Sequence, residues 1–313
     1  MSFSRILTLL KLSNTCFPGF RPGAMKMKLA FITKGVEQAH LVSKFLMAPE
    51  HTALGQIMKS RPNTIGVLVW PYQNAAWSEG ERLAKTFNHY SEIDKIGNPF
   101  NFNIDGRLVL SDLTVMKDGL RIVLDQPTWF MREGGLSLNI FVDSFRAFTI
   151  SFSIYTDEND NRYAVIGGIQ GRNPKDIQRM YDKDVLKLYR ELTKTMHGLR
   201  PRDFLIEVFR MLCRFMNVKT IYGIKDAYRY HEHPYFSKKM ASQSYNAIWE
   251  DRGGAEYSEY FYKLPVSPEV RDISTIKAKK RSLYRKRYSF LEELEQEMRN
   301  ALPSIKPVKF IDT

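Results

Sequence analysis

The sequence predicts a mixed α/β (α+β) fold, in which a helical N-terminal region precedes a mostly antiparallel sheet with flanking helices. The 313 residues are 43% hydrophobic and 26% charged, which is ordinary globular composition and enough chain for a substantial core. Apolar residues follow a helical period in the first hundred residues. Short segments rich in Val, Ile, Phe and Tyr come next, and helical and strand-like segments alternate after them.

Residues 1–100 form the predicted helical region. The segments "KGVEQAHLVSKFLM" and "AAWSEGERLAKTFNHYSEI" place apolar residues near helical spacing. The turn-forming sequences "PEH", "RPN" and "WPYQN" interrupt this pattern. We therefore expect a lead-in of helices that is broken at these three places.

Residues 101–265 form the predicted α/β core. Five successive strands are expected at "GRLVLSDL", "LRIVLDQ", "LSLNIFVDS", "AFTISFSIYT" and "RYAVIGGIQG". The polar turn "TDENDNR" separates the last two, so residues 148–155 and 163–169 should pair as an antiparallel hairpin.

Helices dominate the rest of this core. Asn173 as a cap and Pro174 in the first turn predict a helix that continues through residue 196, and Pro201 opens a second helix. The segment "KTIYGI" is a predicted strand, "SKKMASQSYNAIWEDRGG" a helix closed by glycine, and "EYSEYFYKLP" a further strand.

Residues 266–313 form a basic and then acidic helical tail. The segment "RDISTIKAKKRSLYRKR" is strongly basic, and the acidic, helix-prone "YSFLEELEQEMRNAL" follows it. One interpretation is a solvated helix with opposite charges along it. The other is a nucleic-acid or membrane contact, made by Lys277, Lys279, Lys280, Arg281, Arg285, Lys286 and Arg287.

The overall charge of the chain favours anionic binding partners. The chain carries a net charge of +13 and has a pI of about 9.5. Such a balance favours nucleic acid, an acidic membrane face or a phosphate-bearing ligand, without choosing among them.

Cysteine usage and hydropathy predict a cytoplasmic protein. The two cysteines, Cys16 and Cys213, are too few and too far apart for a disulfide framework or a cysteine-based zinc site. The apolar run at residues 6–10 is broken by Lys11 and is too short for a signal peptide. No segment is long enough for a transmembrane helix, so any membrane contact is expected to be peripheral, at the inner membrane.

A first candidate site is "GGIQGRNP" at residues 167–174. Small residues at a corner between a strand and a helix can let backbone amides hold a phosphate, so Gly168, Gly171 and Arg172 are candidate ligand-binding residues. The segment is neither a Walker loop nor a dinucleotide fingerprint. The alternative is a tight turn packed under the next helix.

A second candidate is "HGLRPRDF" at residues 197–204. His197, Arg200 and Arg202 gather where a helix begins, and both the helix dipole and the arginines attract anions. The order of strand, Gly/Arg turn, helix and strand is similar to acyl-CoA N-acyltransferases of the GNAT type, in which amides at a helix start hold the cofactor pyrophosphate. The Gln/Arg-x-x-Gly-x-Gly/Ala loop of that family is absent, so the similarity covers topology alone.

A third candidate is "YRYHEHPYF" at residues 228–236. In an extended segment His231 and His233 point the same way, so either a metal site or a general base is conceivable. A metal needs a third ligand, and with no H-E-x-x-H pattern we predict no metal site. A base could be oriented by Asp226 or Asp251. The structural alternative is an aromatic loop that closes over the sheet.

The run from "MHGLRPRDFLIEVFRMLCRFMNVKTIYGIKDAYRYHEHPYF" to "YNAIWEDRGG", with "AVIGGIQG" before it and "FYKLP" after it, resembles the VirK/YbjX family of enterobacterial proteins. The resemblance implies a cytosolic or membrane-associated protein linked to outer-membrane remodelling, resistance to cationic antimicrobial peptides and proper production of surface virulence proteins. It carries no catalytic residues to this chain.

The sequence leaves three hypotheses. The first is acyl transfer from acyl-CoA or acyl-carrier protein, with phosphates near Arg172, Arg200 and Arg202 and with His231 or His233 as base in the same concavity. The second is a non-enzymatic post-transcriptional or export regulator that binds RNA or protein through the basic tail. The third is an adaptor at the inner-membrane surface.

Overall fold

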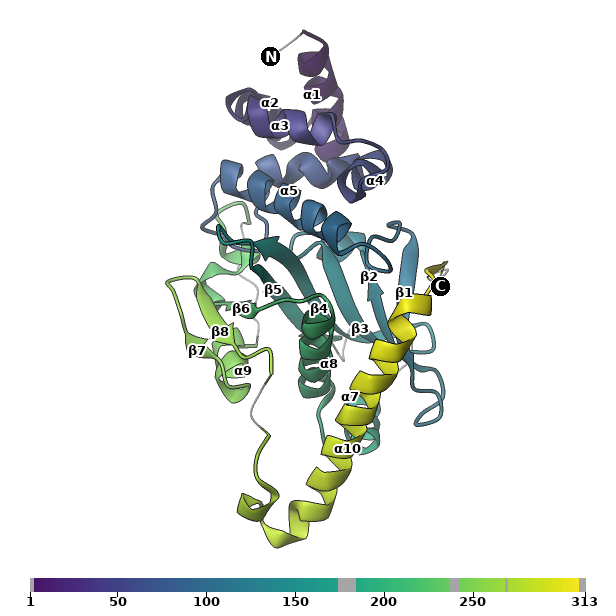
Figure 1. The fold of residues 1–313 in the computed structure, drawn as a ribbon. Helices are drawn as coiled ribbons and strands as arrows, with labels where there is room; N and C mark the ends of the chain where they lie inside the picture. The colour runs from purple at the N-terminus through teal and green to yellow at the C-terminus, as the bar shows by residue number, and fades with distance from the viewer. Residues whose placement is uncertain (1–2, 174–183, 237–242, 268–269, 310–313) are drawn as a thin grey trace.

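The computed structural model describes residues 3–173, 184–236, 243–267 and 270–309 (Figure 1). Helices fill the first hundred residues, as predicted, and the three expected interruptions separate successive helices. Their bounds are α1 (Phe3–Cys16), α2 (Pro22–Glu37), α3 (Ala39–Leu46), α4 (Ala53–Ser60), the 3₁₀ helix η1 (Pro62–Leu68) and α5 (Glu79–Ile96).

Local signals explain where these helices begin. Pro22 occupies the first turn of α2, where its missing N–H costs nothing. Thr52 caps α4 by accepting from the N–H of Gly55. A capping box formed by Ser78 and Glu81 starts α5.

A single mixed sheet follows, in the order β7-β8-β6-β5-β4-β3-β2-β1-β9. The five strands predicted between residues 106 and 171 are all present, and β4 and β5 form the predicted antiparallel hairpin, with Tyr155 opposite Tyr163. Among the strand pairs of the described residues, only β5 and β6 are parallel. The bounds are β1 (Gly106–Asp112), β2 (Leu120–Asp125), β3 (Leu136–Val142), β4 (Phe145–Thr156), β5 (Arg162–Gly171), β6 (Thr220–Ile224), β7 (Ala255–Glu256), β8 (Phe261–Leu264) and β9 (Val308–Lys309).

The segment "EYSEYFYKLP" forms a hairpin rather than the single strand that we predicted. β7 and β8 pair antiparallel across a short turn. The Tyr257 N–H donates to the carbonyl of Phe261 at 3.0 Å, and the Ser258 hydroxyl accepts from the N–H of Tyr260 at 3.3 Å. The serine thus stabilises a reversal inside a segment whose composition indicated only extended chain.

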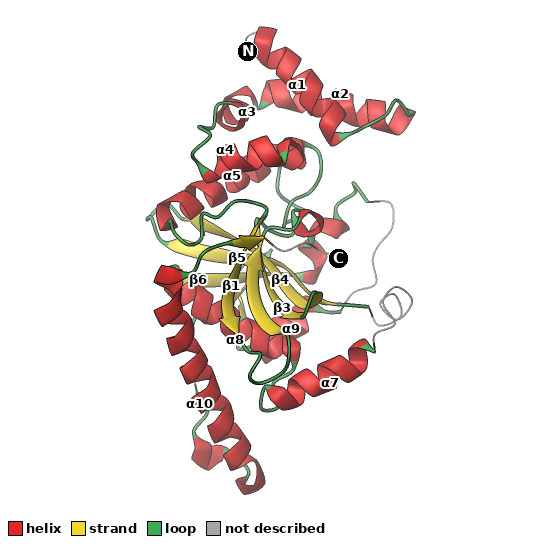
Figure 2. Cartoon of the chain, turned by 90° about the vertical axis from the view of Figure 1, so that its right-hand side faces the viewer, coloured by secondary structure: helices red, strands yellow, loops and turns green. Residues whose placement is uncertain are grey.

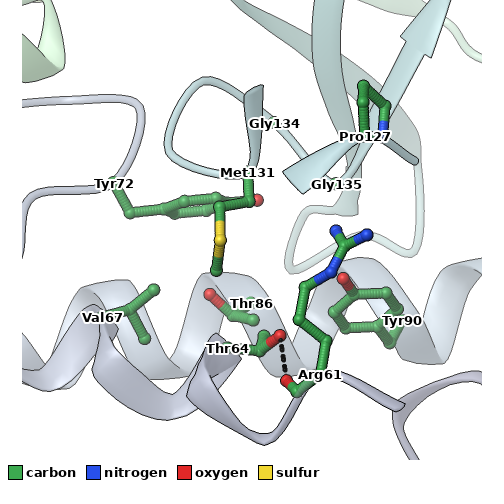
Figure 3. A pocket seen from close by; sticks show the side chains of 10 residues that line it. All are labelled: Arg61, Thr64, Val67, Tyr72, Thr86, Tyr90, Pro127, Met131, Gly134 and Gly135. Atoms are coloured by element: carbon green, nitrogen blue, oxygen red, sulfur yellow. Dashed lines mark hydrogen bonds between the residues drawn. The ribbon is translucent and has the colours of Figure 1, made fainter. Parts of the chain in front are cut away.

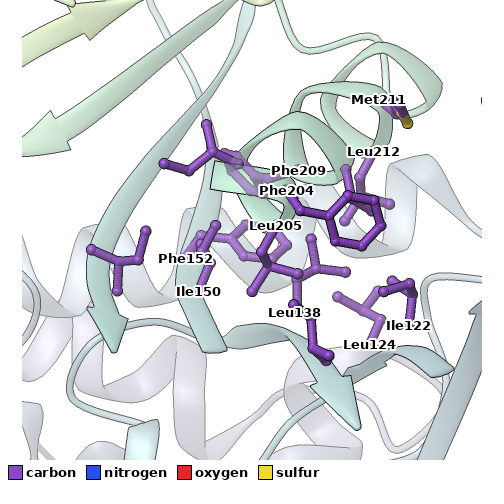
Figure 4. Close-up of a cluster of buried hydrophobic side chains, with 14 of the residues drawn as sticks. Ile122, Leu124, Leu138, Ile150, Phe152, Phe204, Leu205, Phe209, Met211 and Leu212 are labelled. Atoms are coloured by element: carbon purple, nitrogen blue, oxygen red, sulfur yellow. The ribbon is translucent and has the colours of Figure 1, made fainter. Parts of the chain in front are cut away.

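The two faces of the sheet are covered by different helices. Ile154 belongs to one buried cluster and the adjacent Tyr155 to the other, because successive residues of a strand point to opposite faces. Helix α8 (Pro201–Phe215) covers the apolar face, where Phe209 meets Phe152 edge-on at 4.8 Å (Figure 4). Helix α5 packs on β4 from the opposite face.

The helices after the hairpin follow the predicted order with shifted ends. Helix α8 begins at Pro201, as predicted. Helix α7 (Val185–Thr195) begins after Asp184, whose carboxylate accepts from the N–H of Lys187; the first part of the predicted helix, residues 174–183, lies outside the described residues. Helix α9 (Tyr245–Asp251) is capped by Ser244, and residues 237–242 of its predicted first part also lie outside the described residues.

Helix α10 (Ala278–Ala301) lies within residues 266–313, the predicted tail. Its acidic half lies beside the sheet, and Arg214 of α8 makes paired hydrogen bonds with Glu295 at 2.9 and 2.5 Å. Figures 1 and 2 show its basic half projecting away from the sheet. In the part of the chain that the structure describes, no helix has the length and apolar character needed to cross a bilayer.

Candidate functional site at the divergence of two parallel strands

The parallel pairing between β5 and β6 ends before β5, the longer of the two strands, reaches its last residue. Pairing stops at Ile166 opposite Gly223, whereas β5 continues to Gly171. A bulge marks this point, since Ser151 pairs with Gly168 but the next residue of β4 pairs with Ile166, so that Gly167 has no partner on β4. The edge of β5 that faced β6 is therefore open to other groups beyond Ile166.

Glu133 fills the space beside this divergence. A Cβ at Gly167 would lie 2.1 Å from the Glu133 carbonyl oxygen, and one at Gly168 would lie 1.9 Å from Glu133 Oε2. Both glycines thus allow a close approach of the 127–135 loop to β5. They lie inside the strand, so the predicted corner between strand and helix is wrong for these two residues, and the glycines accommodate a carboxylate rather than present amides to a phosphate.

The Glu133 carboxyl is buried, with 7% of the residue exposed. Its Oε2 accepts from Gln170 Nε2 at 2.9 Å, and the Ser151 hydroxyl also hydrogen-bonds to it. Burial raises its pKa from 4.5 to about 7, while Arg229, Gln170 and Ser151 favour the charged form. This carboxyl therefore gains and loses a proton near neutral pH, as a general base must.

Gln73 holds the loop against the strand. Its side-chain amide donates to the carbonyls of Glu133 at 3.0 Å and Val165 at 3.1 Å, and its Oε1 accepts from the Tyr155 hydroxyl. Figure 3 shows a small cavity beside the same loop, between η1 and α5. Its volume is about 10 Å³, room for one water at most, so it is not a substrate site.

Two tyrosines and an arginine complete the surroundings of Glu133. The Tyr245 oxygen accepts from the Ile169 N–H at 2.9 Å, which occupies the open edge of β5. The Arg229 guanidinium lies 3.6 Å from the centre of the Tyr245 ring. Burial and then the Glu133 charge raise the pKa of Tyr245, and raise the pKa of Tyr230 to about 12, so both phenols stay protonated at neutral pH.

The two histidines of "YRYHEHPYF" have different surroundings. Residues 230–232 form a 3₁₀ turn, so the extended conformation that would align both rings is absent. His231 is buried, its Nε2 lies 3.4 Å from Glu232 Oε1, and burial and Arg229 lower its pKa. His233 accepts through Nδ1 from the Tyr235 N–H at 3.0 Å, and burial followed by Arg82 lowers its pKa.

The carboxylates expected to orient a histidine bind other groups. Asp226 accepts from the Ser244 hydroxyl and the Tyr245 N–H, both at 2.7 Å, and thereby supports the start of α9. Asp251 accepts from Arg200 and from two further arginines. Among the described residues, no three His, Cys, Asp or Glu side chains gather as metal ligands.

The arginines at the start of α8 are already paired. Arg200 contacts Asp203 at 2.6 Å and Asp251 at 3.2 Å, and Arg202 contacts the same carboxylates at 3.0 and 3.4 Å. His197 lies elsewhere in this turn, with its ring 5.4 Å from Phe290 of α10. The predicted anion site is therefore an ion-pair cluster that includes its own carboxylates.

The contacts that the structure describes do not bring the predicted ligand-binding and catalytic residues together in one concavity. Arg172 donates through Nε to the Arg146 carbonyl at 3.0 Å, and Gly171 packs on Tyr189. Gly168 touches Glu133, and His231 shares Arg229 with Glu133 as an electrostatic neighbour. Only Gly168 and His231 of the predicted set thus belong to the surroundings of Glu133.

Some basic residues of the tail hydrogen-bond to backbone carbonyls, and the others are exposed to solvent. Arg287 donates twice to the His197 carbonyl, both at 3.1 Å, and Arg281 donates to the carbonyls of Ile276 and Ser274. The others are exposed and make no side-chain hydrogen bond or ion pair within the described ranges: Lys277, Lys279, Lys280, Arg285 and Lys286.

Sequence reasoning missed Glu133, Gln170, Arg229 and Tyr245. One signal was present, because two of the three "GG" pairs in the sequence, at residues 134–135 and 167–168, lie at predicted strands. Paired glycines beside strands indicate a close backbone approach. Nothing in the pattern identified the carboxyl that approaches them.

Comparison with known proteins gives the family. The family model described as "Protein of unknown function (DUF535)" matches residues 22–300. Two uncharacterized proteins of Haemophilus influenzae are 33% identical over 108 residues (34% of this chain, 36% of the relative) and 28% identical over 192 residues (56% and 60%). The uncharacterized protein YbjX of Escherichia coli is 32% identical over 143 residues (44% and 40%).

These relatives are matched over part of their length only, between 36% and 60%. No solved structure matches the chain significantly. The family match covers most of the chain and includes both β5 and the Glu133 loop, and YbjX is among the relatives, which confirms the VirK/YbjX resemblance. The chain belongs to the DUF535 family.

Proposed function

We propose that this protein transfers an acyl group from a phosphopantetheine-bearing donor, acyl-CoA or acyl-carrier protein, to an acceptor amine or hydroxyl. The observation that carries the proposal is the buried Glu133 carboxyl, with a pKa of about 7, placed where β5 and β6 diverge. A base that is half-ionised at neutral pH is suited to this reaction.

The chemistry balances with groups at this site. Glu133 takes the proton of the acceptor as its nitrogen or oxygen bonds to the acyl carbon. The bond between that carbon and the thioester sulfur then breaks. Glu133 then passes the proton that it took from the acceptor to the departing thiolate, which leaves as the free thiol, and the carboxylate is restored.

Donor binding requires the open edge of β5. Residues 167–171 can pair with the amides of an extended pantetheine arm once the Tyr245 hydroxyl releases the Ile169 N–H. Donor phosphates are assigned to Arg172, Arg200 and Arg202, as the sequence suggested. The cluster at the start of α8 supports this assignment through its charge, since three arginines face two aspartates (3 − 2 = +1).

The test combines calorimetry with a transfer assay. We expect acetyl-CoA or a longer acyl-CoA to bind the parent protein, and Glu133→Gln to retain binding while losing transfer. Arg200→Ala with Arg202→Ala should weaken binding. Transfer should rise with pH around 7 in the parent, because the ionised carboxyl is the base.

The variants His231→Gln and His233→Gln distinguish Glu133 from the two histidines as the general base. Transfer retained in both variants supports Glu133, and loss in either one assigns the base to that histidine instead. Absence of donor binding, or full transfer by Glu133→Gln, would overturn the proposal.

The cellular role that we propose is support of outer-membrane remodelling, resistance to cationic antimicrobial peptides and production of surface virulence proteins, exerted from the cytoplasm. Its support is the family membership, together with the acyl transfer proposed above for the Glu133 site. Survival in polymyxin should fall when the gene is deleted and return with the parent but not with Glu133→Gln. Rescue by Glu133→Gln would separate the cellular role from acyl transfer.

A second candidate is a non-enzymatic role at an anionic surface, with the inner membrane as the favoured surface. Residues 1–36 contain six Lys or Arg and no Asp or Glu. Phe20 is 86% exposed and Leu29 67% exposed. Exposed apolar side chains among basic residues are typical of peripheral membrane contact. The five exposed cations of the α10 region add to the attraction.

Co-sedimentation with vesicles tests this candidate. Vesicles containing phosphatidylglycerol should bind the parent, and Phe20→Ser with Leu29→Ser should reduce binding. Val115→Ser is the matched control, because Val115 is also fully exposed but lies outside this region. Binding of RNA, weakened by salt and by replacing the exposed cations of α10, together with no vesicle binding, would instead favour the regulator.

A further inference from the structure

A groove lies at the edge of the sheet opposite the β5–β6 divergence. It runs between β1, β9 and the turn after β2, with a volume of about 420 Å³. This volume is within the range of roughly 300–1,000 Å³ that small-molecule sites occupy. We call it the β1–β9 groove, and the lining residues that matter are Arg61, Asp105, Arg107, Asp125, Trp129 and Lys309.

The charges of the groove favour an anion. Three of these described side chains are basic and two are acidic (3 − 2 = +1). Asp125 is already bound, since it accepts from Arg107 at 3.2 Å, from Arg146 at 2.7 Å and from Asn139 at 2.9 Å. Because Arg146 lies behind the groove and shares this carboxylate, Asp125 contributes little negative potential to a ligand.

Arg61 and Lys309 both line the groove, one from the helical region and the other from the last strand. Arg61 lies between α4 and η1, and Figure 3 shows its side chain extending past Tyr90 toward the 127–135 loop. Its Nη2 donates to the Gln126 carbonyl at 2.8 Å, which fixes the guanidinium beside the groove. Lys309 is exposed on β9, where it pairs with Gly106. Two cations that line the same groove can both bind one phosphate.

Trp129 supplies a flat surface beside these charges. It is 56% exposed, whereas Trp70, Trp77 and Trp249 are 5%, 7% and 0% exposed. The Arg146 guanidinium lies 5.4 Å from its ring centre, and Phe130 meets it edge-on at 6.1 Å. The protein therefore contacts one part of the indole, and the exposed part of the ring is available to a stacking partner.

We propose that the β1–β9 groove binds a ring-bearing monophosphate, with the phosphate between Arg61 and Lys309 and the ring stacked on Trp129. The ring can be a nucleobase or a sugar, because both present a flat face to an indole. The proposal does not depend on acyl transfer, since none of these residues belongs to the Glu133 site.

Tryptophan fluorescence tests the proposal directly. Three of the four tryptophans are buried, so an added ligand or quencher acts mainly on Trp129. Adenosine 5′-monophosphate and glucose 6-phosphate represent the two kinds of ring, and adenosine, glucose and inorganic phosphate are the partial ligands. We expect at least one ring monophosphate to protect Trp129 from acrylamide, at a concentration where its two parts do not.

Variants identify the contacts. Trp129→Phe should remove the signal, and calorimetry should then show weaker binding. Lys309→Gln should weaken binding roughly tenfold, the effect of losing one charge-assisted hydrogen bond. Lys306→Gln is the matched control, because Lys306 is exposed on the same segment but does not line the groove.

Three outcomes would overturn the proposal. They are no binding of either ring monophosphate at millimolar concentration, equal binding by Lys309→Gln and Lys306→Gln, and equal protection by phosphate alone. Glu133→Gln should bind these ligands as the parent does, so failure of the acyl-transfer proposal leaves this one standing.

Discussion

Replacement of Glu133 by glutamine should make the folded protein more stable, and increasingly so as the pH rises. The carboxyl is buried against Gly167 and Gly168, and burial disfavours its charged form. Glutamine has nearly the same shape and can still accept from Gln170 while donating to Ser151. The variant therefore removes the titration of this position and keeps its packing.

The magnitude follows from the pKa. Glu133 titrates at 4.5 when unperturbed and at about 7 in the folded protein. A raised carboxyl pKa means that the folded state holds more protons than the unfolded state between these values, so ionisation destabilises the fold as the pH rises. At about 1.4 kcal/mol per pH unit, this interval corresponds to about 3 kcal/mol once the group is fully charged.

Urea unfolding between pH 4.5 and pH 8 measures the effect. The difference in unfolding free energy between Glu133→Gln and the parent should grow by about 2–3 kcal/mol over this range. Glu158→Gln, on the exposed turn between β4 and β5, should show no such growth. A constant difference between Glu133→Gln and the parent at every pH would refute the reasoning, because it would mean that the folded protein does not raise the pKa of Glu133.

Three further predictions concern the same half of the molecule. Gly167→Ala should cost about 3 kcal/mol or more in urea unfolding, because its Cβ would lie 2.1 Å from the Glu133 carbonyl oxygen, and Gly23→Ala, with no atom within 4 Å, should cost nothing. Asp125→Asn should cost about 3–5 kcal/mol, because two buried arginines lose the carboxylate that they share, and an unchanged urea midpoint would contradict this. Burial lowers the pKa of His89 from 6.5 to about 4, so this histidine favours unfolding as the pH falls through that window, while Glu133 opposes the change; His89→Asn should therefore gain stability relative to the parent between pH 7 and pH 4.5, as thermal unfolding at the two pH values measures.

The sequence predicted the strands well, because a half-buried strand shows its alternation directly. Ile150, Phe152 and Ile154 alternate with Ser151 and Ser153, which identifies β4 and one apolar face. Alternation cannot tell what covers the polar face. Here α5 and the 127–135 loop bury it, and Ser153 becomes the hydrogen-bond partner of both Tyr72 and the Gly135 N–H.

The order of strands and the site depended on information that local patterns do not contain. β9 has two residues and joins the sheet only by pairing with β1, and β8 lies between β6 and β7 through a reversal at Ser258. Glu133 looks like a solvated loop residue in the sequence. It is buried because the 127–135 loop packs against β5. The same contact explains why the predicted phosphate-binding corner at Gly168 was wrong, since Gly168 makes room for the Glu133 carboxyl.

Two buried titratable groups with opposite pKa shifts, His89 and Glu133, lie beside the 133–135 segment. A Cβ at Gly135 would lie 2.1 Å from His89 Nε2, so His89 and Glu133 flank the same short segment. Between pH 4.5 and 6.5, Glu133 is protonated in the folded protein but largely ionised in the unfolded chain. In the same range His89 is neutral in the folded protein but largely protonated in the unfolded chain. The two linkages have opposite signs and nearly cancel. Above that range His89 is neutral in both states and only Glu133 still titrates. Of this pair, Glu133 is thus the group that exchanges a proton near pH 7, at the open edge of β5, where the proposed reaction needs a base.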